Sequence, residues 1–303
     1  MRIFDPVRHS IAAPVRRSAL ALGGIAALSA WVANTPPIMS QEGTPPAYEV
    51  YAVRFATQAS YPTRFLVAGA DTGRRSQLAF TIWLLRSERY TVIVDAGFYR
   101  DKFVSRWKPV AFVKPTEALG ALGVKPEDVT DIVLSHIHWD HLDGADLFPR
   151  ARVWLQREEL EHHTNDSGVV LDRAIDPDDA KMLIAMKAAG RVHLVGGDSV
   201  EIIPGITVFT GGKHTFASQY VAVHASLAGG RTGTVVLASD NAYLYENLER
   251  RRPIAQTLDS LSNARALERM FRLASDARLV VPGHDMEVFT RFPKPGNGVA
   301  RIW

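Results

Sequence analysis

The chain has 303 residues, of which 47% are hydrophobic and 22% are charged, a composition typical of a soluble globular protein whose core is large enough to fold without cross-links. It contains no cysteine, which excludes disulfides, thiolate metal ligands and cysteine nucleophiles. The net charge of +3 arises entirely within residues 1–40, which hold four arginines and one aspartate, so the formally neutral remainder gives no reason to expect binding to nucleic acid or an anionic membrane.

Residues 1–40 have the features of an export signal and the start of a linker. Arg16 and Arg17 precede an apolar, small-residue run at 18–33, which is shorter than the about 20 residues of a membrane-spanning helix. The arginine pair resembles a twin-arginine signal, with a Sec-type signal or an uncleaved anchor as alternatives. We therefore predict an exported, periplasmic protein, with no stable membrane association once the signal is removed, and one folded domain over residues 41–303.

From residue 48 onward the pattern alternates between strands and helices. Strands are predicted at 48–55, 80–85, 90–94, 132–134, 152–155, 193–195, 206–210, 220–224, 234–238 and 279–281. Helices are predicted at 116–122, from about 156, from 177 until Gly190, and at 259–274. This mixture favours an α/β fold with sheets covered by helices and polar side chains on loops at the strand ends.

The most informative stretch follows the predicted strand at 132–134. It contains His136, His138, Asp140 and His141. Imidazole and carboxylate are ligands that zinc favours, and one carboxylate among several histidines is typical of hydrolytic zinc centres. Folding alone does not account for this density, because buried histidines and carboxylates each need polar partners. The stretch therefore predicts a metal site.

Further candidate ligands come later in the chain, each after an apolar strand. Asp240 directly follows the strand at 234–238 and can bridge two cations by offering one oxygen to each. His284 follows the strand at 279–281, and His214 follows a Gly-Gly pair. The other histidines of this region are interpreted as a solvated helix end, for His162 and His163, and as strand residues, for His193 and His224.

The run His-x-His-x-Asp-His at 136–141 resembles the motif of the metallo-β-lactamase-fold hydrolases. The resemblance implies a four-layer αβ/βα sandwich of two mixed β-sheets flanked by helices. It also implies two Zn²⁺ ions sharing a bridging hydroxide. The implied ligands are His136, His138 and His214 for one ion, Asp140, His141 and His284 for the other, and Asp240 between them.

Two departures from the family pattern concern loops. The family usually shows Pro-Gly-His-Thr where this chain has Gly-Lys-His-Thr at 212–215. Asp143 stands where relatives have a small residue, and it is either a partner of a ligating histidine or a simple turn residue.

Asp95 matches the family's Val-Asp-x-Gly segment, which supports the metal-binding loop; a strand-capping turn is the alternative. Trp139 is expected to shape a pocket wall or to pack in the core.

Tyr243 narrows the substrate class. Its place three residues after Asp240 resembles the N-acyl homoserine lactonases, in which such a tyrosine hydrogen-bonds the carbonyl region of a small-molecule substrate. Packing of the following helix, with Tyr245 and Leu248, is the alternative. The resemblance implies that the hydroxide opens a lactone ring, that Tyr243 and a zinc ion stabilise the oxyanion, and that Asp140 passes a proton to the leaving oxygen.

Two other functions remain open at this point. A thioesterase of the glyoxalase II kind would use the same metals, and residues 291–294 weakly resemble the basic C-terminal segment of those relatives. A metal-binding scaffold without turnover is the second alternative. Metal analysis combined with turnover of lactones and thioesters separates the three.

Overall fold

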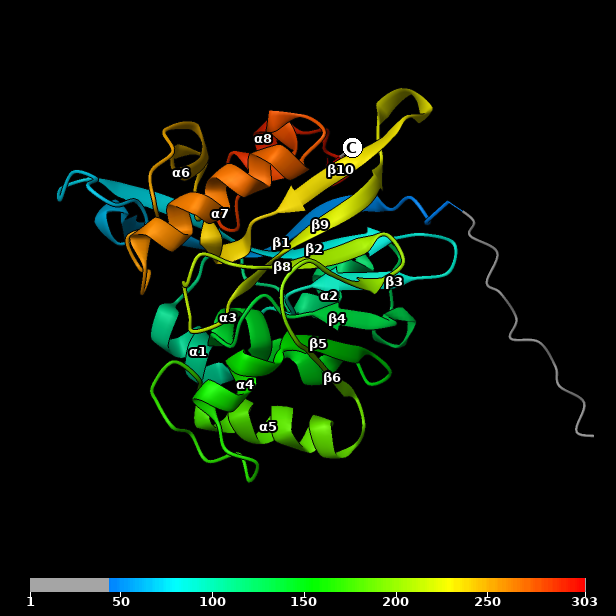
Figure 1. Cartoon of the computed structure of the whole chain (residues 1–303), viewed down its shortest axis with the longest axis vertical. Coiled ribbons are helices and arrows are strands. Elements are labelled where there is room, and N and C mark those ends of the chain that lie inside the picture. Colours follow the sequence, from blue (N-terminus) through cyan, green and yellow to red (C-terminus); the bar gives the residue numbers. More distant parts are fainter. Residues whose placement is uncertain (1–43, 303) are drawn as a thin grey trace, which may run out of the picture. The chain divides into compact units, whose positions relative to one another are not determined.

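Two β-sheets form the centre of the structure and lie between layers of helices (Figure 1). The computed structural model describes residues 44–302, so the predicted export signal lies outside the described residues. None of the described helices combines the length and apolar character that crossing a membrane requires.

Seven strands form the first sheet in the order β12-β1-β2-β3-β4-β5-β6. The pairings among β12, β1, β2 and β3 are antiparallel and those from β3 to β6 are parallel, so the sheet is mixed. Its strands are β1 (Glu49–Pro62), β2 (Arg75–Arg86), β3 (Thr91–Val94), β4 (Asp131–Val133), β5 (Arg152–Gln156), β6 (Val192–Val195) and β12 (Val299–Ile302).

Five strands form the second sheet in the order β11-β10-β9-β8-β7. The pair β10–β11 is parallel and the other pairs are antiparallel, so this sheet is mixed as well. Its strands are β7 (Val200–Ile203), β8 (Ile206–Thr210), β9 (Gln219–Ser226), β10 (Thr232–Leu237) and β11 (Val280–Val281).

The helices flank the sheets, as predicted. Helices α4 and α5 pack against β5 and β6, and α7 packs against β10. The helices are α1 (Asp101–Trp107), α2 (Pro115–Gly120), α3 (Trp139–Leu142), α4 (Arg157–His163), α5 (Pro177–Ala188), α6 (Tyr245–Glu249), α7 (Ser260–Leu273) and α8 (Val288–Arg291). The start of α5 follows the prediction, because Asp176 caps the backbone N–H of Asp178.

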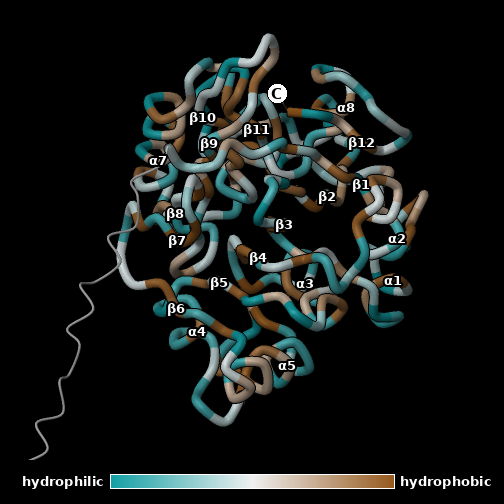
Figure 2. Tube along the Cα trace, turned by 90° about the vertical axis from the view of Figure 1, so that its right-hand side faces the viewer, coloured by the Kyte–Doolittle hydropathy of each residue, from teal (hydrophilic) through white to brown (hydrophobic). Residues whose placement is uncertain are grey.

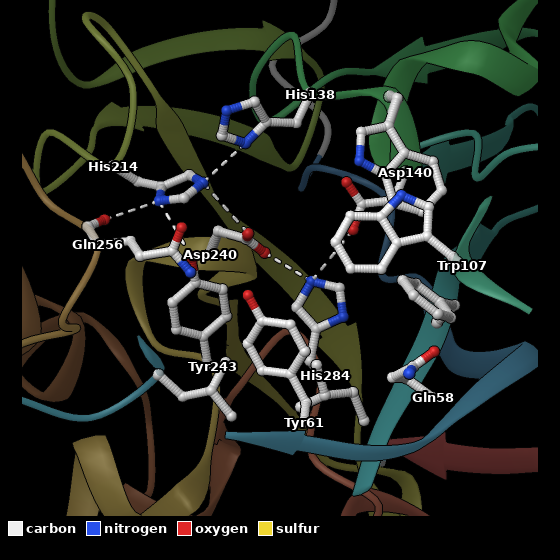
Figure 3. A pocket seen from close by; sticks show the side chains of 14 residues that line it. Gln58, Tyr61, Trp107, His138, Asp140, His214, Asp240, Tyr243, Gln256 and His284 are labelled. Atoms are coloured by element: carbon white, nitrogen blue, oxygen red, sulfur yellow. Dashed lines mark hydrogen bonds and ion pairs between the residues drawn. The ribbon is translucent and has the colours of Figure 1, made fainter. Parts of the chain in front are cut away.

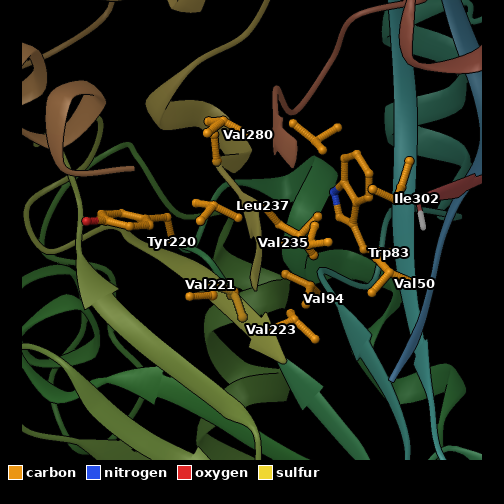
Figure 4. Packing of buried hydrophobic residues seen from close by; sticks show 14 of the residues in the cluster. Val50, Trp83, Val94, Tyr220, Val221, Val223, Val235, Leu237, Val280 and Ile302 are labelled. Carbon is orange, nitrogen blue, oxygen red and sulfur yellow. The ribbon is translucent and has the colours of Figure 1, made fainter. Parts of the chain in front are cut away.

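The core between the sheets explains why the strand sequences are apolar throughout. Along β3, Val94 points into the space between the sheets, where it meets residues such as Val223 and Leu237 (Figure 4). Ile93 points the other way, into the core beneath the helices. A strand covered on both faces needs apolar residues at every position, rather than at alternate ones. Figure 2 shows hydrophobic stretches on strands such as β1 and β5 and hydrophilic residues on loops.

Several predicted boundaries were wrong, and several elements were not predicted. Strand β1 runs to Pro62, past the predicted end at residue 55, because pairing with β2 continues through two irregularities in register. Strands β7 and β12 and helix α1 were missed. The four-residue strands β7 and β12 depend on pairing with β8 and β1, respectively, which is not visible in their own sequences.

Candidate metal centre

All predicted metal ligands lie on segments that follow the carboxyl ends of strands. The motif at 136–141 follows β4, His214 follows β8, Asp240 follows β10 and His284 follows β11. Figure 3 shows side chains from these separate elements pointing toward a common centre. The two-sheet framework therefore brings together residues that are up to half the chain apart.

The ligand atoms form two sets that share Asp240. One set contains His136, His138 and His214 with Asp240, and the other contains Asp140, His141 and His284. Asp240 offers one carboxylate oxygen to each set: Oδ2 lies 3.3 Å from His214 Nε2, and Oδ1 lies 2.8 Å from His284 Nε2. These two groups of side chains are those that the family resemblance implied.

The first set places nitrogen atoms against one another. His138 Nδ1 lies 3.0 Å from His136 Nε2 and 2.9 Å from His214 Nε2. Burial, together with the neighbouring imidazoles, lowers the pKa values of His136 and His138 well below the usual value, so both rings are neutral at pH 7. Lone pairs of neighbouring imidazole nitrogens repel one another. A cation between these nitrogens would remove that repulsion, because each lone pair could bind it.

The outward nitrogens of the other rings are held by acceptors. The Nδ1 atoms of His214 and His284 each lie 2.9 Å from a backbone carbonyl, of Gln256 and Ala79 respectively. A carbonyl can only accept, so it keeps a proton on Nδ1 and directs Nε2 into the centre. The buried Nε2 of His141 has no hydrogen-bond partner. These residues fit a metal ion, because a cation would use the inward lone pairs.

Asp240 and Asp140 experience opposite electrostatic effects. Burial by itself would raise the pKa of Asp240, but the facing rings of His284 and His141 lower it well below the usual value. Burial raises the pKa of Asp140 despite its proximity to the same two histidines. The shared carboxylate is therefore the more readily ionised of the two, which suits a residue that faces both ligand sets.

Asp95 contacts the loop that carries candidate ligands, which is the first of its two interpretations. Its carboxylate accepts hydrogen bonds from the backbone N–H of Ser135, at 2.8 Å, and from the hydroxyl of Ser239, at 3.1 Å. Oδ2 also lies 2.8 Å from His141 Nδ1. Asp95 thus ties the end of β3 to both halves of the site and orients one histidine.

Asp143 does not contact a candidate ligand, so its interpretation as a partner of a ligating histidine was wrong. Its carboxylate accepts the backbone N–H groups of Tyr99 and Arg100, at 2.7 and 3.1 Å, and pairs with the Arg100 guanidinium. A second buried carboxylate, Asp179, lies 2.7 Å from the same guanidinium. Asp143 therefore faces away from the metal centre.

The loop before His214 adopts a strained shape. Lys213, where the family usually has glycine, has a φ of 58°, a left-handed conformation that costs a non-glycine residue about 1–2 kcal/mol. Its ammonium group donates to the carbonyl of Phe216, at 2.6 Å. This bond closes the loop, and His214 reaches the site despite the departure from the family pattern.

A pocket with aromatic walls opens above the candidate ligands (Figure 3). Trp139 lines it and stacks on Trp107, with ring centroids 5.2 Å apart, so it shapes the wall and also packs. Tyr243 lines the same pocket, and its hydroxyl lies 3.2 Å from His214 Nδ1. The alternative that Tyr243 packs with Tyr245 was wrong, because Tyr245 belongs to a different buried cluster.

Comparison with protein families agrees with this site. Residues 79–284 match the model of the metallo-beta-lactamase superfamily, a range that includes every candidate ligand. The chain belongs to the metallo-beta-lactamase superfamily. It is a metal-dependent hydrolase with lactonase-like relatives.

The characterised relatives of this superfamily member include several lactonases. An N-acyl homoserine lactonase from a Bacillus species is 28% identical over 232 residues, which cover 71% of this chain and 84% of the relative. The N-acyl homoserine lactonase AttM of Agrobacterium fabrum is 29% identical over 185 residues, covering 59% of this chain and 66% of AttM.

Solved structures of the superfamily share the fold. A quorum-quenching N-acyl homoserine lactone lactonase has a TM-score of 0.66 at 20% identity, with 82% of this chain and 96% of that chain covered. AidC, described as a dizinc quorum-quenching lactonase, has a TM-score of 0.56 at 12% identity, with coverage of 80% and 92%. At these identities the likeness establishes the fold alone.

Glu159 was missed as a site residue. From its buried place in α4 it accepts the hydroxyl of Thr215, at 2.5 Å, and the backbone N–H groups of Ala217 and Ile137, at 2.6 and 3.3 Å. Ile137 lies between two candidate ligands, and Thr215 directly follows His214. In the sequence Glu159 shows only as an acidic residue in the first turn of a helix, since its partners lie on two other segments.

The rest of the pocket wall was also missed, and one histidine was misjudged. The pocket residues that the sequence did not single out are Gln58, Tyr61, Leu66, Leu78, Phe80, Trp107 and Gln256. No local motif marks them, because they come from β1, β2, α1 and two loops. His163 is buried, so the prediction of a solvated helix end was wrong for it, whereas His162 is exposed.

Proposed function

We propose that this hydrolase opens the ring of an N-acyl homoserine lactone or a closely similar lactone, with two Zn²⁺ ions held by the two ligand sets. The observation that carries the proposal is the shared pocket: the hydroxyl of Tyr243 lies 3.2 Å from His214 Nδ1, and Asp240 faces both ligand sets. The N-acyl homoserine lactonases among the relatives support the same substrate class.

The side chains that line the pocket suggest a role for each group in the proposed reaction. When bound, the zinc ions supply Lewis acidity for the substrate carbonyl and make water acidic enough to attack at neutral pH. The phenol of Tyr243 donates a hydrogen bond to the carbonyl oxygen as negative charge develops there. Asp140 accepts the proton that the attacking water gives up and passes it to the ring oxygen as the C–O bond breaks.

The apolar walls suit the acyl part of such a substrate. Phe80, Leu66 and Leu78 line the pocket beside the two tryptophans. An acyl chain placed there leaves water, and each buried CH₂ contributes about 0.8 kcal/mol of binding free energy. The reacting carbonyl is then held over the candidate ligands at the pocket floor.

The glyoxalase II-like alternative finds less support. Arg291, at the start of the basic segment at 291–294, pairs with Glu249 and Glu287 and does not line the pocket of the metal centre. An arginine engaged in this way is not available to a glutathione moiety in that pocket.

A panel of N-acyl homoserine lactones and thioesters tests the proposal on metal-replete protein. We expect lactone turnover, and a fall in kcat of about 10²-fold in Tyr243→Phe, the usual effect of removing one oxyanion donor. Tyr245→Phe is the matched control. Thioester turnover without lactone turnover would overturn the substrate assignment, unchanged lactone turnover in Tyr243→Phe would remove Tyr243 from the mechanism, and bound metal without any hydrolysis would favour a scaffold.

We also propose that the chain is exported to the periplasm, on the basis of the arginine pair and the apolar run in residues 1–40. Fractionation of cells that express the full chain tests this, with N-terminal sequencing of the mature protein. Replacement of Arg16 and Arg17 by lysine distinguishes the two export routes. Export by the twin-arginine route should stop, whereas export through a Sec-type signal should continue.

A further inference from the structure

A second histidine cluster lies at the end of α4, outside the catalytic pocket. His162 and His163 are the last residues of α4, and Asp172 lies on the segment between α4 and α5. Their ligand atoms lie within 4.8 Å of one another, as do those of each catalytic set. Two imidazoles and a carboxylate are a donor set typical of zinc and similar divalent transition metals.

The spacing of the three donors is close to that of a coordination sphere. Asp172 Oδ2 lies 2.6 Å from His163 Nδ1 and 3.7 Å from His162 Nε2. Zinc bonds to these atom types measure about 2.0–2.2 Å, so neighbouring donors around a tetrahedral ion lie about 3.3 Å apart. The two donor separations from Asp172 therefore lie on either side of the value for a tetrahedral ion.

The buried ring nitrogen of His163 lacks a hydrogen-bond partner. This is a second observation, independent of the spacing of the three donors. The side chain of His163 is only 4% exposed, and its Nε2 makes no hydrogen bond. Nδ1 lies 2.6 Å from the Asp172 carboxylate, and Nε2 faces the carboxylate of Glu159 at 3.9 Å, beyond hydrogen-bond distance. A buried ring nitrogen without a hydrogen-bond partner is unfavourable.

A cation at the cluster would resolve this arrangement. A metal ion on Nδ1 displaces the proton from that atom, and the neutral ring then carries its proton on Nε2. There it can donate to Glu159, which gives the carboxylate–histidine–metal arrangement common at zinc sites. His162 and Asp172 have side chains that are 42% and 38% exposed, so the ion and its remaining water ligands can enter from solvent.

We propose that His162, His163 and Asp172 form a third cation site, for Zn²⁺ or a similar divalent metal, that braces the loop carrying His214. His162 stacks on Phe216 of that loop, with ring centroids 3.8 Å apart and an interplanar angle of 3°. Glu159 accepts from Thr215 and Ala217 of the same loop. An ion at the end of α4 would therefore bind His162, which stacks on the loop, and His163, whose Nε2 faces Glu159.

Isothermal titration with zinc chloride tests the site in the full-length protein that already holds its catalytic metal. We expect a further equivalent of zinc per chain to bind. Asp172→Asn removes a charged ligand, and His162→Phe keeps the stack on Phe216 but removes a nitrogen donor. Each should weaken this binding by about tenfold or more. His193→Phe is the matched control, because His193 also stacks on an aromatic ring, that of Trp154.

The outcomes are distinct. Loss of the extra equivalent in His162→Phe and Asp172→Asn but not in His193→Phe supports the site, and zinc anomalous scattering between the three side chains places it. Absence of an extra equivalent in the wild-type chain, its persistence in both variants, or a scattering peak elsewhere overturns the proposal. Because the comparison uses differences between variants, it stands whether or not the enzyme hydrolyses lactones.

Discussion

Two clusters of carboxylates include residues of the segment at 140–143 and are neutralised in different ways. In one cluster, Asp140 faces the metal centre, whose pocket contains no lysine or arginine among its lining residues. In the other, Asp143 and Asp179 are completely buried and share the guanidinium of Arg100. One cluster carries its own permanent cation, whereas the other is built so that a cation must come from solution.

Carboxylates that are close together in a sequence can therefore have unrelated roles. Asp140 and Asp143 are three residues apart, yet one belongs to the metal site and the other anchors the segment at Tyr99 and Arg100. A buried carboxylate is stable only with a compensating partner. The partner, a metal ion or an arginine, separates a candidate metal ligand from a structural residue.

The largest expected effect is loss of the shared ligand. Asp240→Ala removes the carboxylate that faces both sets, and metal centres of this kind supply several kcal/mol of transition-state stabilisation. We expect hydrolysis to fall by about 10³-fold or more, with less metal bound per chain, measured by kinetics and elemental analysis. Asp143→Asn is the matched control and should keep its metal content. Full activity in Asp240→Ala would contradict the site.

Removing the internal cation should affect folding rather than metal content. Arg100→Met leaves Asp143 and Asp179 buried without their partner, and breaking a buried ion pair in this way costs about 3–5 kcal/mol. We expect the free energy of unfolding in urea to fall by about that amount, with unchanged metal content in the folded fraction. If the variant instead loses metal while remaining as stable as the wild type, the two clusters are not independent.

Glu159→Gln tests whether the hydrogen bonds of Glu159 support metal binding. The glutamine is of similar size but replaces one accepting oxygen with an NH₂ group, so it cannot accept all the hydrogen bonds from Ile137, Thr215 and Ala217. Supporting groups of this kind contribute about 10- to 100-fold to metal affinity. Competition with a chelator should show such a loss, and the visible spectrum of the cobalt-substituted enzyme should shift.

The exposed neighbour Glu158 supplies the matched control for Glu159, because Glu158→Gln changes the same charge on the same helix. It should leave both the affinity and the cobalt spectrum unchanged. Equal effects of the two substitutions would mean that helix charge, rather than the hydrogen bonds of Glu159, is responsible.

The last expected effect is a pH dependence of stability at the arginine cluster. Burial, with the nearby Asp143, raises the pKa of Asp179 from 3.8 to about 8 in the folded state. Between these values the unfolded chain has released the proton and the folded chain still binds it, so the contribution of Asp179 to stability falls as pH rises from about 4 to 8. Asp179→Asn cannot ionise and should lack this decline.

Unfolding in urea at pH 5 and pH 8 measures the effect. The stability of Asp179→Asn relative to the wild type should be higher at pH 8 than at pH 5. An unchanged difference between the two pH values would show that Arg100 keeps Asp179 ionised throughout.

The sequence by itself determined the reaction centre of this protein. His136, His138, Asp140 and His141 lie within six residues after β4, so they stay near one another through the chain itself. Asp240 and His284 follow apolar strands, and strand ends meet at one edge of a sheet. The α/β class followed for a similar reason, because the length and spacing of apolar runs reflect local geometry.

Only the tertiary structure decided what surrounds that centre. Glu159, Trp107 and Gln58 reach the site or its pocket through contacts with residues far away in the chain, which leave no pattern among their neighbours. The orientation of Asp143 depended in the same way on Arg100, 43 residues away. Ligand spacing is a local property of the backbone, whereas burial and pairing depend on which distant segments pack together.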